Sequence, residues 1–447
     1  AMDTYIRKEY DARRSLTHVY AGEEFLGSEN GDTTFESFGA VVDIGTTTLV
    51  ASLANLNSGE ELDSVSALNP QAVHAQDVLS RIKLASEKSG LKLMYSELIA
   101  EINRMIVHLA RKNNISNERI YEVVFSGNTC MLHLATNTNP YSLGRFPYNP
   151  EIIGDIHLKS SEHNLVISKF GLIYLPPIIS AYVGADITSG ILASQLHERK
   201  GITLFVDIGT NGEMVLACDG SLSATSTAAG PAFEGMNITH GMRAGTGAVE
   251  FFNIEDRGNI TIKTIGNEEA VGICGSGLLD IVGELVAFGV INKNGKLINP
   301  EKELILPALR ERIMEQDGKL VFKVADQILL TQKDIRQVQL AKGAIRTGIE
   351  FLLKSKGIKA SEVDKVLIAG SFGYHLRAKS LMNIGLLPRE FEGKIEFIGN
   401  TSKSGGQAFL LNKNYRKQMA ELVKDIEVIE LANYKDFDKV FVSYLNF

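Results

Sequence analysis

The same short pattern ends an apolar run at two places in this sequence. It occurs in AVVDIGTTTLVASL at residues 40–53 and in LFVDIGTNGEMVLA at residues 204–217. In both copies Asp-Ile-Gly-Thr follows a run typical of a buried strand, and an apolar strand pattern resumes after a few small residues. The sequence therefore predicts strand, Gly/Thr turn and strand, used twice in one chain.

A turn of this kind suits the binding of an oxyanion. A glycine in the turn lets the backbone approach a phosphate closely, and neighbouring N–H groups and Thr hydroxyls donate to its oxygens. The Asp at the strand end holds Mg²⁺ through water. We therefore expect Asp43 and Asp207 to be metal-binding and catalytic residues, although each copy alone also fits an ordinary hairpin turn. The expected phosphate-binding residues are Gly45, Thr46, Thr47, Thr48, Gly209, Thr210, Asn211 and Gly212.

The repetition continues beyond the two turns. The first copy is followed by a strand and glycine at 122–132 and by a Gly-led helix at 183–196. The second is followed by a strand and glycine at 365–376 and by a Gly-led helix at 398–411. Three motif types in the same order indicate two similar lobes made by duplication, because the periods of solenoids are far shorter.

The expected boundaries follow from this duplication. Residues 1–37 are polar, contain the loop signal SENGDTT and show no periodicity, so we expect a linker or the remnant of an upstream domain. Lobe I then covers 38–200, and lobe II covers 201–447 with inserts and a C-terminal tail. A chain of 447 residues is long for a single core, which agrees with two compact units.

Periodicity and capping signals predict the main helices. One helix is expected to start at Asn69-Pro70, to end before Gly90, and to carry Val73, Val78, Leu79 and Ile82. A second presents Leu98, Ile102, Met105 and Leu109 on one face. A long helix capped by Thr331 and stopped by Gly357 is expected to cover the second sheet. After it, the tail is predicted to form a helix, a strand at 426–431 and a final helix.

Three further places are candidates for ligand contact. Asp186 falls at a helix N-terminus, where the dipole favours anions, so it is either a catalytic residue or an ordinary first-turn charge. The Gly-rich insert 226–250 includes Glu234. Residues 271–285 lead a Gly-rich turn into an amphipathic helix, and tight packing of helix on sheet is the alternative for both inserts. The candidates in this second turn are Gly275, Ser276 and Gly277.

Charge and composition exclude several classes of protein. A net charge of −7 argues against nucleic acid as the main partner. A membrane span is not expected, because the sequence has no sufficiently long apolar run, and the N-terminal residues lack an apolar signal core. Three scattered cysteines predict neither a disulfide framework nor an iron–sulfur cluster within this chain. A reducing, cytoplasmic location is therefore expected.

Taken together, the motifs resemble those of the superfamily of acetate and sugar kinases, heat-shock chaperones and actin. Its two phosphate loops resemble residues 43–48 and 207–213, and its two interlobe helices resemble those beginning at Gly184 and Gly399. The resemblance implies an α/β fold of two duplicated RNase H-like lobes of the actin-like ATPase type, with a cleft between them. It also implies an adenosine loop at 369–373, with Gly370, Ser371 and Gly373 as nucleotide-binding residues.

A closer resemblance rests on the motifs as a set. GAVVDIGTTT, NPQ at 69–71, GNTCMLHL, DIGTNGE, AAGPAFEG, GICGSGLLD and AGSFG are together similar to those of ATP-dependent reductive activators of corrinoid proteins. The resemblance covers nearly everything from Phe38 onward. It implies an ATPase that uses ATP and Mg²⁺ while one electron passes from an iron–sulfur cluster to cob(II)alamin in a corrinoid methyl carrier, restoring cob(I)alamin.

The same resemblance sets expectations about partners. They are a corrinoid protein of a methyltransferase system, of the O-demethylase type, and a reduced electron donor; a homodimer stays open as an oligomeric state. The family carries its cluster in an N-terminal ferredoxin-like domain. The cysteines of that domain are missing from this sequence, so the cluster is expected only in a domain that is not included here.

Three alternatives use the same fold. A sugar or acyl kinase would add a carboxylate base and a hydroxyl-binding pocket, whereas the extra motifs here are Gly-rich. An activator of a 2-hydroxyacyl-CoA dehydratase would bind a cluster between two subunits, and Cys274 has no second cysteine nearby in the sequence. A chaperone-like protein would need a substrate domain for which this chain has no room.

Overall fold

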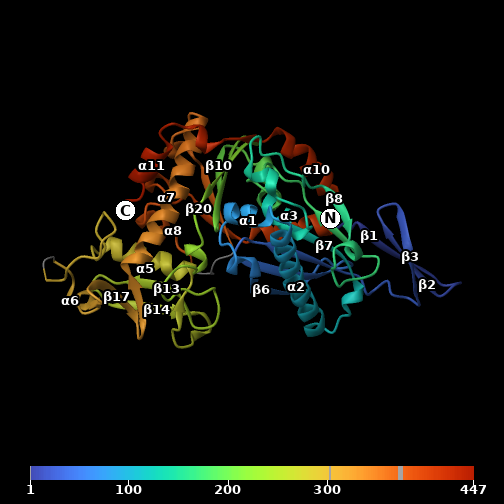
Figure 1. The fold of residues 1–447 in the computed structure, drawn as a ribbon, viewed down its shortest axis with the longest axis horizontal. Coiled ribbons are helices and arrows are strands. Elements are labelled where there is room, and N and C mark those ends of the chain that lie inside the picture. Colours follow the sequence, from blue (N-terminus) through green and yellow to red (C-terminus); the bar gives the residue numbers. More distant parts are fainter. Residues whose placement is uncertain (1, 302–303, 371–375) are drawn as a thin grey trace. The chain divides into compact units, whose positions relative to one another are not determined.

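The chain divides into two compact units in a computed structural model that describes residues 2–301, 304–370 and 376–447 (Figure 1). Unit 1 comprises Ala1–Glu198 and Asn400–Val428, and unit 2 comprises Arg199–Gly399 and Ile429–Phe447. The expected lobe II at 201–447 is therefore wrong for residues 400–428, which return to unit 1. The reason is packing, because the helices of this segment bury their apolar sides on the first sheet.

Unit 1 is built on a six-stranded sheet of order β6-β5-β4-β7-β9-β8. The first three strands are antiparallel neighbours, and β7 pairs with β4 and β9 in parallel. The central strands are apolar and buried on both faces, as expected for a sheet covered by helices. The bounds are β4 Phe38–Ile44, β5 Thr48–Asn55, β6 Glu61–Leu68, β7 Ile120–Gly127, β8 Ile156–Lys159 and β9 Leu172–Leu175.

Helices cover this sheet, and one pair of them approaches unusually closely. α4 packs on α9, and α9 packs on β4 and β7. A Cβ on Gly405 would lie 2.0 Å from the Ser189 carbonyl oxygen, and one on Gly406 would lie 2.5 Å from Cγ1 of Val41. Only glycine therefore permits this contact. The helices of unit 1 are α1 Val78–Ala85, α2 Lys88–Lys112, α3 Thr129–Ala135, α4 Ala185–Ser194, α9 Thr401–Leu411 and α10 Asn414–Leu422.

The stretch after β6 differs from its predicted form. Asn69 does cap a helical turn, but that turn is the short 3₁₀ helix Pro70–Val73, and Asp77 starts α1 separately. Val73 and Leu79, expected on a buried face, are 78% and 61% exposed. Gly90, expected after the helix end, lies inside α2. The predicted apolar face of α2 is confirmed, since Leu98, Ile102, Met105 and Leu109 are buried.

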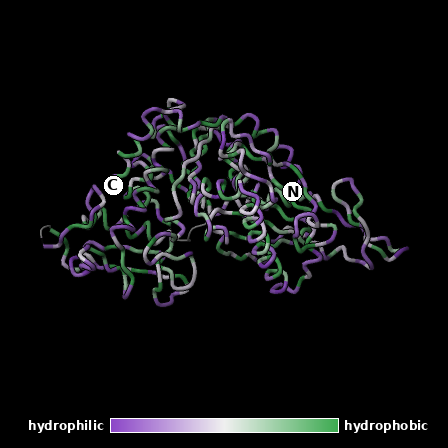
Figure 2. Tube along the Cα trace, viewed as in Figure 1, coloured by the Kyte–Doolittle hydropathy of each residue, from purple (hydrophilic) through white to green (hydrophobic). Residues whose placement is uncertain are grey.

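The N-terminal residues form a sheet, so the linker alternative expected for 1–37 is wrong, and the other alternative, a remnant of an upstream domain, stays a prediction. The strands β1 Ile6–Asp11, β2 Leu16–Ala21 and β3 Glu24–Asn30 pair antiparallel. Figure 2 shows hydrophilic residues at the outer turns of this sheet. Its attachment to unit 1 is polar: the Glu29 carboxylate is 3.0 Å from Lys8 Nζ and 2.7 Å from Arg119 Nη1, and it accepts a 2.6 Å bond from the Tyr121 hydroxyl. β2 does alternate, with Thr17, Val19 and Ala21 buried, but this run is only six residues long and its neighbours β1 and β3 are mostly polar.

Unit 2 repeats the central arrangement of unit 1. Its main sheet has the order β20-β19-β10-β11-β12, with β10 antiparallel to β11 and parallel to β19. The strand, turn, strand prediction is thus confirmed in both copies. The bounds of this sheet are β10 Ile202–Ile208, β11 Asn211–Cys218, β12 Ser221–Ala228, β19 Lys365–Ala369 and β20 Ile395–Gly399.

Among the residues that the structure describes, two small sheets and five α-helices complete unit 2. The inserts form the sheets β14-β13-β15 and β16-β17-β18. The strand bounds are β13 Ala248–Ile254, β14 Ile260–Thr264, β15 Gly272–Ile273, β16 Ile313–Gln316, β17 Lys319–Ala325 and β18 Ile328–Thr331. The helix bounds are α5 Gly275–Ala287, α6 Pro307–Arg310, α7 Gln332–Ser355, α8 Ala378–Asn383 and α11 Phe437–Ser443.

The long helix α7 follows its prediction closely. Thr331 caps it and forms a capping box with Asp334, and its apolar stripe is buried against β11 and β12. The tail is only partly as predicted, because the strand expected at 426–431 is reduced to β21, Glu427–Val428. Among the described residues, no helix has the length and apolar character needed to cross a membrane.

A buried ion pair anchors the returning segment in unit 1. Arg416 on α10 donates two hydrogen bonds, of 2.7 and 2.9 Å, to the Glu122 carboxylate on β7, and its guanidinium lies 4.1 Å from the Tyr174 ring centroid. Burial acts to raise the pKa of Glu122, but Arg416 and His157 outweigh it and hold the pKa below the ordinary value. The contribution of this carboxylate to stability is therefore present above its unfolded pKa and lost as the pH falls through its lower folded pKa.

We expect Arg416→Met to lower the free energy of unfolding by about 3–5 kcal/mol at pH 7, because it leaves the Glu122 charge buried without its partner. Urea denaturation measures this change. The double variant Arg416→Met/Glu122→Gln is the control, and it should recover part of the loss. A single variant as stable as the wild type would contradict the anchoring role.

Candidate active site

The first Gly/Thr turn, between β4 and β5, is closed by its own backbone. Gly45 N–H donates to the Thr48 carbonyl at 3.1 Å. A Cβ on Gly45 would lie 2.3 Å from that carbonyl oxygen, so the turn requires glycine at this position. Asp43 is the last but one residue of β4 and is 8% exposed. The turn therefore holds a buried carboxylate beside a compact loop of small residues.

Two asparagines hold this turn in place. The Asn69 side-chain amide donates to the Gly45 carbonyl at 2.9 Å, and Asn69 N–H donates to the Thr47 carbonyl at 2.7 Å. The Asn128 amide donates to Thr46 Oγ1 at 3.1 Å. The loop is therefore fixed from two sides before any ligand arrives, which is the kind of preorganisation that anion binding needs.

A third asparagine holds the carboxylate itself. The Asn400 amide donates to Asp43 Oδ2 at 2.9 Å, while its side-chain oxygen accepts from Lys403 N–H at 3.0 Å and caps α9. Asn128 likewise caps a helix, at the start of α3, where its side-chain oxygen accepts from Met131 N–H at 2.9 Å. Sequence reasoning missed both roles. The signal was Gly-Asn-Thr after a strand, at 127–129 and again at 399–401.

Asp186 lies close enough to Asp43 for the two charges to interact. It occupies the first turn of α4 after the N-cap Gly184, where a Cβ would lie 2.4 Å from Asn128 Cα. Burial, and then the charge of Asp43, raise the pKa of Asp186 to about 7. Unit 1 thus brings together Asp43, Asp186 and the turn that contains Gly45, Thr46, Thr47 and Thr48.

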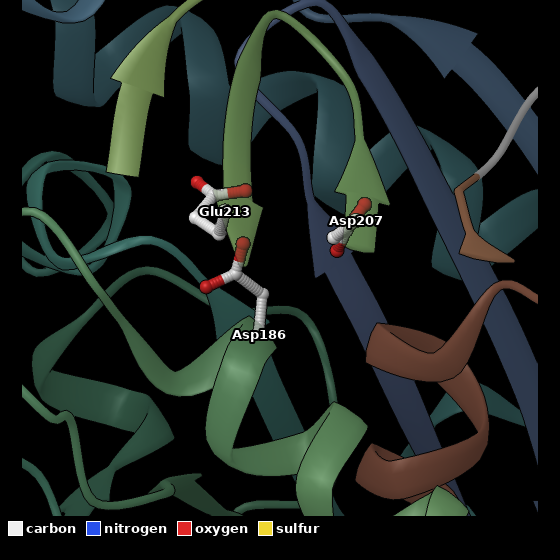
Figure 3. A group of neighbouring side chains, drawn as sticks. All are labelled: Asp186, Asp207 and Glu213. Atoms are coloured by element: carbon white, nitrogen blue, oxygen red, sulfur yellow. The ribbon is translucent and has the colours of Figure 1, made fainter. Parts of the chain in front are cut away.

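The second turn, in unit 2, places two carboxylates on neighbouring strands. Asp207 on β10 and Glu213 on β11 are directly opposite in the antiparallel register, and carboxylate oxygens of the two lie within 4.8 Å of each other. Figure 3 shows them with Asp186, which is drawn at the start of α4. Glu213 is 4% exposed and was not singled out from the sequence. A set of carboxylate oxygens fits the ligand preference of Mg²⁺.

The turn between β10 and β11 is also braced by its neighbours. Gly209 N–H donates to the Asn211 carbonyl at 3.2 Å, and the Thr210 carbonyl accepts from Ala229 and Gly230 N–H. The Thr210 hydroxyl donates to Glu234 Oε2 at 2.6 Å. Glu234, predicted to bind the nucleotide, thus has a structural task of orienting Thr210. Its nucleotide contact stays a prediction, as do those of Asn211 and Gly212.

The Gly-rich start of α5 is packed against backbone. A Cβ on Gly275 would lie 1.8 Å from the Phe233 carbonyl oxygen, and one on Gly277 would lie 1.9 Å from that of Val249. Ser276 is fully buried and donates to the Glu250 carbonyl at 3.0 Å. Tight packing accounts for all three small residues, and their nucleotide contact remains untested.

Gly370 directly follows β19, and its N–H donates to the Gly399 carbonyl at 3.0 Å. The other two residues predicted for the adenosine loop, Ser371 and Gly373, lie outside the described residues. The cysteines do not form a site in the part of the chain that is described, because none of them joins a group of three or more possible metal ligands. Cys130 and Cys274 are buried, and burial raises the pKa of Cys130 to about 12.

Comparisons with known proteins identify the family. Two family models match, the RACo middle region at 38–199 and the C-terminal domain of RACo, the ASKHA domain, at 201–447. The chain belongs to the RACo family. A curated relative is the corrinoid activation enzyme RamQ of Eubacterium limosum, 34% identical over 414 residues, which are 91% of this chain and 69% of that protein.

Two further RACo relatives support this assignment. The [Co(II) methylated amine-specific corrinoid protein] reductase of Methanosarcina barkeri is 26% identical over 442 residues, covering 92% of this chain and 77% of that one. A solved structure, described as a reductive activator for corrinoid, iron–sulfur protein, matches with a TM-score of 0.90 at 34% identity. The match covers 96% of this chain and 70% of the chain in that solved structure. The predicted actin-like ATPase fold is therefore confirmed, and so is the predicted family.

We expect Asn400→Ser to keep the cap of α9 while removing the amide that holds Asp43, because serine caps helices as well as asparagine does. Its thermal midpoint should stay near that of the wild type. Affinity for Mg²⁺-nucleotide should fall about fivefold, the equivalent of one lost hydrogen bond of about 1 kcal/mol. Calorimetric titration measures the affinity.

Asn400→Ala is the matched comparison, since it loses the cap as well and should cost about 1 kcal/mol of stability. Wild-type affinity in the serine variant would show that Asp43 does not depend on Asn400.

Proposed function

We propose that both Gly/Thr turns take part in binding Mg²⁺-ATP, and that this chain is the ATPase of a corrinoid-activating system. The observation that carries the proposal is the repeated placement of an aspartate at the strand end before a braced turn, at Asp43 and at Asp207. Repeated carboxylate and Gly/Thr elements of this kind suit a polyphosphate and its cation.

Different residues are proposed to contact the cation, the phosphates, the attacking water and the adenosine. Asp43 and Asp207 hold the hydrated cation, and the backbone N–H and Thr hydroxyl groups of both turns donate to phosphate oxygens. Mg²⁺, when bound, neutralises charge on the phosphates and so favours hydrolysis. Asp186, beside Asp43 at the start of α4, orients the attacking water. Gly370, Ser371 and Gly373 hold the adenosine end, with Glu234 and the start of α5 as further contacts.

Replacement of Asp207 by asparagine should slow ATP hydrolysis about a hundredfold or more, because the change keeps the shape and removes the charge that faces the cation. Stability should change by less than about 1 kcal/mol, since the change also removes the repulsion between Asp207 and Glu213 on the neighbouring strand. Asp256→Asn, in an exposed loop of unit 2, is the control. Normal ATP turnover by a folded Asp207→Asn protein would show that Asp207 does not take part in ATP hydrolysis.

The reaction served by this ATPase is reductive activation of a corrinoid. One electron leaves a reduced iron–sulfur centre, which is oxidised, and enters cob(II)alamin, which becomes cob(I)alamin. We infer that the partner is a corrinoid protein of a methyltransferase system, of the O-demethylase type or of the methylated-amine type named for the Methanosarcina relative. The electron donor and a homodimer belong to this proposal, as does a location in the cytoplasm. The kinase and dehydratase-activator alternatives have no support among the matching families.

We expect slow ATP hydrolysis by this 447-residue chain alone, and faster hydrolysis when a cognate corrinoid protein in the cob(II) state is added. The physical reason is linkage: a partner that binds one state of the ATPase better shifts its equilibrium toward that state. The same mixture should not form cob(I)alamin, because an iron–sulfur cluster is needed to deliver the electron. Phosphate release measures the expected stimulation of ATP hydrolysis. Corrinoid absorbance, followed in the same mixture, measures whether cob(I)alamin forms. Absence of stimulation would contradict the partner, and efficient ATP-dependent reduction would contradict the need for a cluster.

A further inference from the structure

A groove of about 760 Å³ runs along α2 in unit 1, away from the Gly/Thr turn. One wall is the helix and the other is the loop that carries Val166. The lining residues from α2 recur at helical spacing, so they form one face of the helix. They are Ala100, Asn103, Arg104, Val107, His108, Arg111 and Lys112.

The loop wall is held rigidly against the helix. The Asn103 amide donates to the Asn164 carbonyl at 2.8 Å, and Val166 N–H donates back to Asn103 Oδ1 at 3.0 Å. The Asn117 amide donates to the Val166 carbonyl at 2.7 Å. Val166 nevertheless remains 40% exposed, so an apolar side chain faces water in a groove that is already formed.

The rim of the groove is cationic. Arg104, His108, Arg111 and Lys112 line it, and no lining residue is acidic. Arg104 pairs with Glu101, and Lys112 lies 3.3 Å from Asp63, whereas Arg111 and His108 make no ion pair within the part of the chain that is described. Arg111 and Lys112 also complement the C-terminal dipole of α2, but that effect is confined to the last turn and does not account for Arg104.

We propose that this groove docks an acidic segment of the corrinoid protein that carries an apolar side chain. Charge complementarity selects the occupant, since a cationic rim attracts carboxylates and the apolar floor of Ala100, Val107 and Val166 takes an aliphatic side chain. From residue 100 to residue 112 the helix rises about 18 Å, enough for about five residues of an extended segment. The identity of the partner rests on the proposed function.

Nucleic acid is the less favoured occupant. The groove lining contains no aromatic residue on which a base could stack, and the chain as a whole carries a net charge of −7, which repels a long polyanion. A short acidic segment meets the local positive rim without meeting the rest of the surface.

The test compares two charge-reversal variants of the helix that have the same net charge as each other. Arg104→Glu/Arg111→Glu reverses two rim charges, and Lys88→Glu/Lys92→Glu reverses two exposed charges at the other end of α2, outside the groove. Neither Lys88 nor Lys92 makes an ion pair among the described residues. The affinity of each protein for the cob(II) corrinoid protein is measured by calorimetric titration at low and at high salt, with basal ATP hydrolysis as the check on folding.

We expect the rim variant to bind at least about tenfold more weakly at low salt, with the difference shrinking at high salt, while the Lys88/Lys92 variant binds much like the wild type. Equal affinities of the two variants would contradict docking of the corrinoid protein in this groove, and would leave the proposed function unaffected. A wild-type protein that does not bind the corrinoid protein would instead overturn the proposed function. Binding of a single-stranded RNA probe that is lost only in the rim variant, with corrinoid-protein affinity unchanged, would assign the groove to nucleic acid.

Discussion

The hydrogen bond from Asn400 to Asp43 joins two parts of unit 1 that are far apart in sequence. The 2.9 Å bond fixes a buried carboxylate at a strand end, and the same side chain begins α9. A buried charge without such donors is costly. Because residues 400–428 return to unit 1 after β20, the two units are not contiguous in sequence.

Close backbone packing makes this return possible. At Gly405 and Gly406 the helix α9 lies against α4 and β4, and the Ser126 hydroxyl lies 2.9 Å from those of Ser189 and of Ser402. The buried hydroxyls satisfy one another where larger side chains would hold the helices apart. The residues of this seam are small because larger side chains would not fit between the helices, and the same seam places Asn400 within reach of the Asp43 carboxylate.

Local signals in the sequence predicted the parts of the fold that depend on local physics. The two Gly/Thr turns, the stripe of α2 and the cap of α7 follow from turn chemistry and periodicity, and all three are present. The sheet at β1–β3 was missed because the alternating run in β2 is short and β1 and β3 are rich in polar and charged residues. Asn400 and Asn128 were missed because a capping asparagine has a spare amide group, and only the tertiary fold shows what that amide contacts.

Under the proposed function, the acidity of both turns makes the nucleotide and its cation a single ligand. Asp43 and Asp186 lie together in unit 1, and Asp207 faces Glu213 in unit 2, so each turn already carries excess negative charge. A bare triphosphate adds several more negative charges and would be repelled by both. A divalent cation bound to the triphosphate replaces this repulsion by attraction, because each carboxylate then attracts the cation. The proposed function therefore implies that affinity for ATP and affinity for Mg²⁺ are coupled, and the buried position of Asp43 and Glu213 would strengthen the coupling by limiting screening by solvent.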